Sequence, residues 1–220
     1  MERTDVPGLA TESDGRWEYP RLSLPALPAG RPRPFTEDNR AEIHYADLRE
    51  LLLPAPAGAT PDKKLTGGWV STEQFVSEYE EGYRTVVSAT LRDGALRHIA
   101  ARGWTMPDGT SSRVYLLQFN STAFADGFRD DRAVGVTAGD LLAGVAAMDL
   151  DESWKGSGKV ADTTAHVFEE AKPFGSAQVR QSYLVAGDTV ALIVQSRKGG
   201  GGTPRIPFCQ TVILQNQLLG

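Results

Sequence analysis

The residues best suited to catalysis or metal binding are few and widely separated in this chain. His44, His98 and His166 form neither an HxH nor an HExxH pattern, and the one cysteine, Cys209, has no histidine or lysine near it in the sequence. Zinc sites need several such ligands at short spacing, and a reactive thiol needs a base close by. We predict no metal and no cofactor, although the fold could still assemble a zinc site from distant residues. Cys209 is predicted to be a small buried apolar residue.

An acidic loop offers the nearest approach to a calcium motif. Asp149, Asp151 and Ser153 have the one-three-five spacing of an EF-hand loop. Position six is Trp154 instead of glycine, and position twelve is Val160 instead of glutamate. Both departures remove parts that the motif needs, so calcium binding is disfavoured.

Nucleophile and phosphate motifs are incomplete. Gly156-Ser157-Gly158 lacks the full G-x-S-x-G frame, and the glycine run 199–202 is not followed by the lysine and hydroxyl of a phosphate-binding loop. The run is interpreted as a flexible connector. A hydrolase whose catalytic set comes from distant residues stays open as an alternative.

The loop 149–159 contains the strongest candidate contact residue. Its sequence, DLDESWKGSGK, is polar and rich in glycine, yet it carries Trp154. An indole there either folds back onto the domain or meets a partner. Asp151, Trp154 and Lys155 are the candidate partner-binding residues, and we expect Trp154→Ala to weaken binding while leaving folding nearly unchanged. The other tryptophans are interpreted as packing residues: Trp17, Trp69 and Trp104.

Two strand–turn–strand units supply the framework. The first runs from 95 to 120 around the turn Pro107-Asp108-Gly109, and the second from 178 to 195 around Ala186-Gly187-Asp188. A helix is expected after each, from Ser121 and from Pro204. The sequence predicts an α+β fold, an antiparallel sheet with helices packed on one side. The two units indicate an internal duplication or a chance likeness.

The segment between the start of the chain and the first hairpin is expected to be largely helical. Helices are predicted over 45–53, 72–81 and 83–92, and 54–68 is predicted to be a turn-rich loop. Ser71 with Gln74 fits a capping box, and Gly94 is expected to end the last helix in the left-handed conformation.

The first 34 residues differ from the rest in composition. Prolines at 20, 25, 28, 32 and 34 favour extended geometry, which is typical of a linker or a surface strap, or of a proline-rich ligand for a partner. Leucines 22, 24 and 27 could hold such a strap on the domain. We predict a strap over 1–34, a single domain over 35–220, and a domain that still folds without the strap.

Charge and composition exclude several classes of protein. The 220 residues carry a net charge of −5, so a broad nucleic-acid-binding surface is not expected. No signal peptide follows Met1, and the most apolar stretch, 138–150, is too short to span a bilayer. Read alone, these features indicate a soluble intracellular protein, unless an anchor lies outside this sequence.

Three segments carry a resemblance: DLRELLLPAPAGATPDK (47–63), GALRHIAARGWTMPDGTSSRVYLLQF (94–119) and VILQNQLLG (212–220). They resemble actinobacterial membrane-anchored proteins or lipoproteins of uncharacterised function. The resemblance covers roughly residues 45 to 220 and consists of packing and turn motifs, so it transfers no catalytic residue. It implies an extracytoplasmic α+β domain behind a membrane anchor.

The two hairpin units also look distantly like extracytoplasmic sensor domains of mycobacterial serine/threonine kinases, although this chain lacks the paired cysteines expected there. We therefore expect a non-enzymatic, extracytoplasmic binding or sensor-like domain whose partner is an unknown protein or small ligand. The alternatives are the hydrolase and a structural cell-envelope protein, and the alternative location is the cytoplasm.

Overall fold

A single antiparallel sheet organises the molecule. The computed structural model describes residues 15–131, 142–154, 160–172, 174–199 and 202–220. Within them the strand order is β1-β2-β3-β7-β6-β5-β4, with every neighbouring pair antiparallel. The strands are β1 (Thr60–Trp69), β2 (Leu96–Thr105), β3 (Ser111–Phe119), β4 (Met148–Leu150), β5 (Thr163–Glu170), β6 (Ala177–Ala186) and β7 (Thr189–Lys198). The predicted α+β class with an antiparallel sheet is confirmed.

The two predicted hairpins meet at the centre of this sheet. β3 pairs with β7, so that Val114 faces Ile193 and Leu116 faces Ala191. All four side chains are buried. Their apolar, β-rich sequences suit strands that are covered on both faces.

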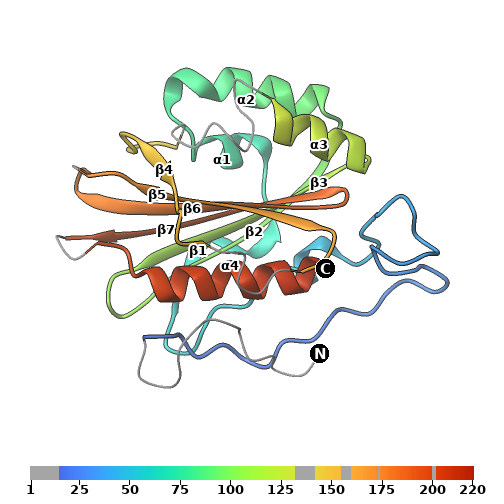
Figure 1. The fold of residues 1–220 in the computed structure, drawn as a ribbon, viewed down its shortest axis with the longest axis horizontal. Coiled ribbons are helices and arrows are strands. Elements are labelled where there is room, and N and C mark those ends of the chain that lie inside the picture. The colour runs from blue at the N-terminus through green and yellow to red at the C-terminus, as the bar shows by residue number, and fades with distance from the viewer. Residues whose placement is uncertain (1–14, 132–141, 155–159, 173, 200–201) are drawn as a thin grey trace.

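Helices cover both faces of the sheet (Figure 1). On one face lie α1 (Thr72–Val76), α2 (Glu81–Asp93) and α3 (Thr122–Asp130), which contribute to one apolar cluster. On the other lie α4 (Arg205–Leu219) and the short 3-10 helix η1 (Leu48–Glu50), which contribute to a second cluster. The sheet is therefore the middle layer of three, whereas the sequence suggested helices on one side only. Because the central strands are apolar on both faces, each face needs its own cover.

The two hairpin–helix units have the same order of elements, but their helices lie on opposite faces of the sheet. α3 follows the β2–β3 hairpin onto one face, and α4 follows the β6–β7 hairpin onto the other. Since β3 and β7 are adjacent and antiparallel, a rotation that superimposes the hairpins would put both helices on the same face. The likeness of the two units is one of element order.

Residues 45–68 depart most from expectation. Only η1 is helical in 45–53, and the predicted loop 54–68 contains most of β1. Side chains, and not the backbone of a helix, supply hydrogen bonds to the backbone of Leu51–Leu53. The Gln215 side chain bonds to Leu51 and Leu53, and the Arg102 side chain bonds to Leu52 and Leu53. β1 has low strand propensity and two irregularities, so its pairing with β2 decides its conformation.

One predicted helix cap, at Ser71, is confirmed, and another, at Gly94, differs from the prediction. Ser71 caps α1, accepting a hydrogen bond from the Gln74 amide at 3.2 Å. Gly94 ends α2 with φ −76°, and Ala95 takes the left-handed conformation with φ +51°. The expected glycine cap is therefore displaced by one residue.

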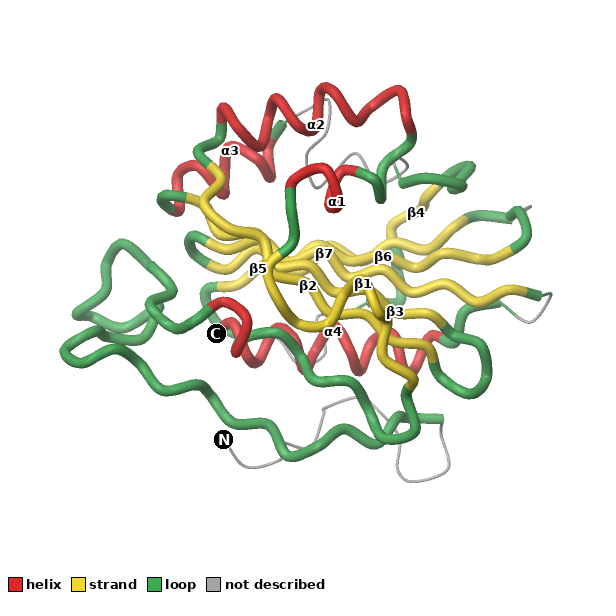
Figure 2. Tube along the Cα trace, turned by 180° about the vertical axis from the view of Figure 1, so that it is seen from behind, coloured by secondary structure: helices red, strands yellow, loops and turns green. Residues whose placement is uncertain are grey.

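The described part of the strap, residues 15–34, lies along the outer side of α4 as a chain without helix or strand (Figure 2). The Trp17 amide donates to the Gln210 side chain at 2.9 Å, and the Trp17 carbonyl accepts from it. The Tyr19 hydroxyl lies 2.8 Å from the Thr211 hydroxyl, and the Tyr19 ring is buried. The strap thus covers the face of α4 that the sheet leaves open.

Candidate functional site

An open groove lies where the strap, the segment 43–48 and the ends of the first two strands meet. Its volume is about 620 Å³, within the usual range for small-molecule sites. Trp69 of β1, Arg97 and His98 of β2, and Arg31 of the strap line it, together with residues from Ile43 to Leu48. We call it the Trp69 groove.

Trp69 forms one wall, and two side chains contact its indole ring. The Arg49 guanidinium lies 4.8 Å from the centre of the indole ring, and the His98 ring centre lies 5.1 Å from it. Asp47 accepts a hydrogen bond from Arg49 Nε at 2.9 Å, which fixes the arginine. This contact lowers the pKa of the Asp47 carboxyl. Trp69 remains 49 % exposed, so an apolar surface faces the groove.

Two guanidinium groups give the groove positive charge. Arg31 lies 4.7 Å from the Tyr45 ring centre, and Arg97 is exposed. Among the described residues neither side chain forms an ion pair or hydrogen bond with an acidic group. The carboxylate of Asp47, also in the lining, is already bound to Arg49. A chain of net charge −5 therefore presents a locally cationic groove.

Within the part of the chain that the structure describes, neither His98 nor His166 has the partners of a catalytic base. His98 is exposed and its ring contacts Trp69. His166, on β5, is half-buried near Arg129 and Asp130, and its Nε2 has no hydrogen-bond partner among the described residues. Within the described ranges, neither ring forms a hydrogen bond with a serine hydroxyl or a carboxylate. The hydrolase alternative therefore gains no candidate catalytic set here.

His44 is buried against the C-terminal end of α4. Its Nδ1 lies 2.8 Å from Asp188 Oδ1, and its Nε2 lies 2.7 Å from the carbonyl oxygen of Leu219. The Thr189 hydroxyl is 3.3 Å from the same Nδ1. A general base needs a nitrogen that faces substrate, and both ring nitrogens are occupied. This histidine therefore holds the groove's wall in place and is closed to substrate.

A second, smaller cavity of about 130 Å³ lies between α1 and the sheet. Glu78 lines it and accepts hydrogen bonds from Arg113 Nε at 3.0 Å and from the Tyr115 hydroxyl at 2.6 Å. Burial and the charge of Glu78 raise the pKa of Tyr115 far above its ordinary value. These polar groups satisfy one another, so the cavity offers little to a ligand.

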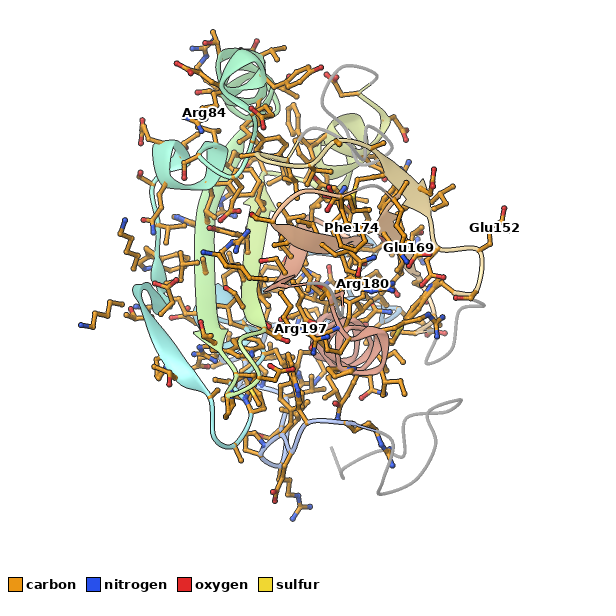
Figure 3. All side chains as sticks on the ribbon, turned by 90° about the vertical axis from the view of Figure 1, so that its left-hand side faces the viewer. Arg84, Glu152, Glu169, Phe174, Arg180 and Arg197 are labelled. Carbon is orange, nitrogen blue, oxygen red and sulfur yellow. The ribbon has the colours of Figure 1, made fainter. Side chains whose placement is uncertain are left out.

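Asp151, one of the predicted contact residues, is buried and bonded within the chain. Its carboxylate accepts from the Ser153 amide at 3.0 Å and from Arg205 Nε at 3.2 Å. Burial acts to raise the pKa of Asp151, but the bonds from Ser153 and Arg205 outweigh it and lower that pKa. Figure 3 shows Arg180 beside Glu169, and their side chains are 2.8 Å apart. Asp151 thus ties the loop to the start of α4.

Trp154 and Lys155 complete the predicted contact set. Trp154 is partly buried against the cluster on the α4 side of the sheet. Lys155 lies outside the described residues. A partner contact through this loop stays a prediction.

Cys209 lies inside α4 and is 4 % exposed. Burial raises the pKa of its thiol. The expectation of a buried apolar cysteine is confirmed for this position, and the thiol is unsuited to nucleophilic chemistry at neutral pH.

Sequence reasoning missed the Trp69 groove because its parts are far apart in the chain. Trp69 was expected to be a packing residue, yet about half of its surface is exposed. Arg97 and His98 reach it only through the pairing of β1 with β2, and β1 was not expected to be a strand. The one available signal was a tryptophan that ends a polar, glycine-containing run.

Comparisons with known proteins gave similarity to solved structures but none to a family or a curated protein. No protein-family model matches the chain, and no curated protein matches it by sequence. The fold is similar to the extracellular domain of PknH from Mycobacterium tuberculosis, with a TM-score of 0.42 and 10% identity over 84% of this chain and 97% of that chain. A similarity at this level supports no inference about ligand or location. Within the described ranges, no helix combines the length and apolar character needed to span a bilayer.

Proposed function

We propose that this chain is a non-enzymatic binding domain whose ligand is a small anion carrying a ring, held in the Trp69 groove. The observation that carries the proposal is Arg97, whose guanidinium has no acidic partner among the described residues and which lines the same groove as the exposed indole of Trp69. Guanidinium groups bind carboxylates, sulfonates and phosphates through paired hydrogen bonds. The indole supplies apolar surface next to them.

The chemistry of the lining supports binding without turnover. The groove joins cationic and aromatic side chains, and His98 there contacts Trp69 instead of a nucleophile. A binding site needs convergent polar groups and apolar walls, whereas hydrolysis also needs an activated nucleophile.

We also propose an extracytoplasmic location, with tethering through a membrane anchor outside this sequence and a sensor-like role. Support for this comes from the resemblance of three sequence segments to membrane-anchored proteins, and from the distant likeness of the two hairpin units to kinase sensor domains. The cytoplasmic alternative is tested by locating the full-length protein after protease treatment of intact cells. Protection of the domain from protease would contradict the proposed location.

The binding proposal is tested with a pair of isosteric probes. Benzenesulfonate is anionic and benzenesulfonamide is neutral, and their affinities are compared by isothermal titration calorimetry. We expect the anion to bind more tightly by about tenfold, because hydrogen bonds to charged groups contribute about 1.5–3 kcal/mol. Arg97→Gln should remove that difference.

Lys63→Gln is the matched control. It also removes one positive charge from the exposed surface, but lies six residues from Trp69 on β1, about 20 Å away at strand spacing. This control should leave benzenesulfonate affinity unchanged. Equal affinity for the two probes, or an equal loss in both variants, would contradict a specific anion site.

A further inference from the structure

A tight turn in the strap presents Arg31 to the Trp69 groove. The Arg31 amide donates to the Pro28 carbonyl at 3.0 Å, and Gly30 between them has φ +74°. A positive φ at the third residue of a hydrogen-bonded turn is the mark of a type II turn, which favours glycine there. The turn reverses the strap at this point, and Arg31 is one of the residues that line the groove.

Tyr45 holds the Arg31 side chain in position. The guanidinium carbon of Arg31 lies over the Tyr45 ring, 4.7 Å from its centre, and Tyr45 lines the same groove. A guanidinium group on an aromatic face keeps the N–H groups at its edge available for hydrogen bonds. In the described ranges the Arg31 side chain forms no ion pair and no hydrogen bond. The contact with Tyr45 therefore positions a positive charge without using its donors.

Two guanidinium groups from distant parts of the chain thus share the groove. Arg31 comes from the strap and Arg97 from β2, and both side chains are exposed. Among the described lining residues the acidic one is Asp47, and its carboxylate is bound by Arg49. A sphere with the volume of the groove, about 620 Å³, is about 10 Å across, so one small ligand can reach both groups. Two like charges that share a groove repel each other, and an anionic ligand relieves this repulsion.

We propose that the ligand of the Trp69 groove carries two separate acidic groups on its ring system, an inference that rests on the proposed function. Arg97 binds one acidic group and Arg31 binds the other, while the exposed indole of Trp69 supplies apolar surface for the ring. Two groups are favoured over a single one because the two arginines come from different segments and their like charges hold them apart. Arg31 then determines specificity, because only a doubly charged ligand uses it together with Arg97, and the strap is part of the binding site.

The affinity of a disulfonate is compared with that of the monosulfonate on the same ring system, by isothermal titration calorimetry. The disulfonates are meta-benzenedisulfonate and a symmetric naphthalenedisulfonate with one sulfonate on each ring, which spans a longer distance. We expect at least one of them to bind about tenfold more tightly than its monosulfonate. Of this gain, about twofold is statistical, because either sulfonate can occupy Arg97, and about fivefold reflects the contact with Arg31, at the upper end for exposed ion pairs.

Arg31→Gln should reduce the gain to the statistical factor of about twofold and should change the affinity for the monosulfonate little. Arg21→Gln is the matched control, because Arg21 is also an exposed arginine of the strap but lies outside the described lining of the groove. The control should keep the full gain. A gain in the wild type that does not exceed the statistical factor for either disulfonate, or an equal reduction in both variants, would overturn the proposal.

A measurement on the wild-type protein identifies the groups that bind. In ¹⁵N spectra, the side-chain Nε–H signal of Arg31 should shift further with the disulfonate than with the monosulfonate, whereas the signal of Arg97 should shift with both. Shifts at Arg97 with both probes and at Arg31 with neither would leave the proposed function intact and overturn the second contact. Binding of no sulfonate at all would contradict the proposed function, and this inference with it.

Discussion

Single residues decide what the groove can recognise. Arg97 supplies a positive charge free of any acidic partner among the described residues, and Trp69 supplies an exposed ring beside it. His44 contributes through position, since its two nitrogens are engaged by Asp188 and Leu219. Arg97 and Trp69 thus supply the groups that recognise a ligand, whereas His44 holds the wall of the groove in place.

The environment of His166 leads to a prediction about how the free energy of unfolding depends on pH. Burial, and then the positive charge of Arg129, lower the pKa of His166, while Asp130 opposes them. The unfolded chain, with a histidine pKa of about 6.5, therefore binds a proton before the folded protein does. The free energy of unfolding should decrease as the pH falls below that value, until the folded-state pKa is reached.

The check is urea denaturation of the wild type and His166→Gln at a series of pH values. The variant should lose less stability on acidification, so the stability of the wild type relative to the variant should decrease as the pH falls. Parallel curves would show that His166 titrates alike in both states.

Cys209 gives a second residue-scale prediction. Because burial raises the pKa of its thiol, the native protein should react with a thiol reagent such as DTNB far more slowly than the urea-unfolded protein does. Labelling kinetics with and without urea measure this. Equal rates would mean that α4 does not cover the thiol.

At the scale of elements, the sequence indicated the strong hairpins and missed the weak strands. β3 and β7 have apolar centres, and β7 is also rich in β-branched residues. The turn before each strand contains a glycine at positive φ, Gly109 before β3 and Gly187 before β7. β1, with sequence TPDKKLTGGW, has little intrinsic preference for strand, and only its pairing with β2 makes it one. The groove depends on β1, so it could not be predicted from local sequence.

Trp154 provides the prediction for the loop 149–154. Its ring packs against the apolar cluster on the α4 side of the sheet, while Asp151 anchors the same loop to Arg205. Trp154→Ala should therefore lower Tm by a few degrees, more than the sequence alone led us to expect, whereas Trp154→Phe should retain most of the stability. Thermal unfolding followed by circular dichroism measures both. An unchanged Tm in the alanine variant, together with weaker partner binding, would support the loop as a contact surface instead.

At the scale of the whole molecule, the strap completes the layer that α4 begins. Most of α4 is buried, including Gln210, Thr211 and Gln215, because the sheet lies on one side and the strap and residues 51–53 lie on the other. Figure 2 shows the strap running past the outer side of this helix. Sequence composition indicated an extended strap, but the partners that hold it are almost two hundred residues away.

Deleting residues 1–34 tests this arrangement. The deletion removes the Trp17 and Tyr19 contacts with α4, so Tm should fall. Unfolding should remain cooperative, because the sheet and the cluster under α1–α3 are intact. Deletion of 1–14 alone is the control. A Tm equal to that of the control would mean that the strap adds no stability, and loss of cooperative unfolding would refute a separate domain over 35–220.

The most direct test of the central claim is where the anionic probe binds. The four tryptophan indole N–H signals, from Trp17, Trp69, Trp104 and Trp154, can be followed together in a ¹⁵N spectrum during titration with benzenesulfonate. We predict that the Trp69 signal shifts in a saturable manner while that of Trp104, buried in the core, stays in place. A saturable shift at another tryptophan with Trp69 unmoved would contradict the account.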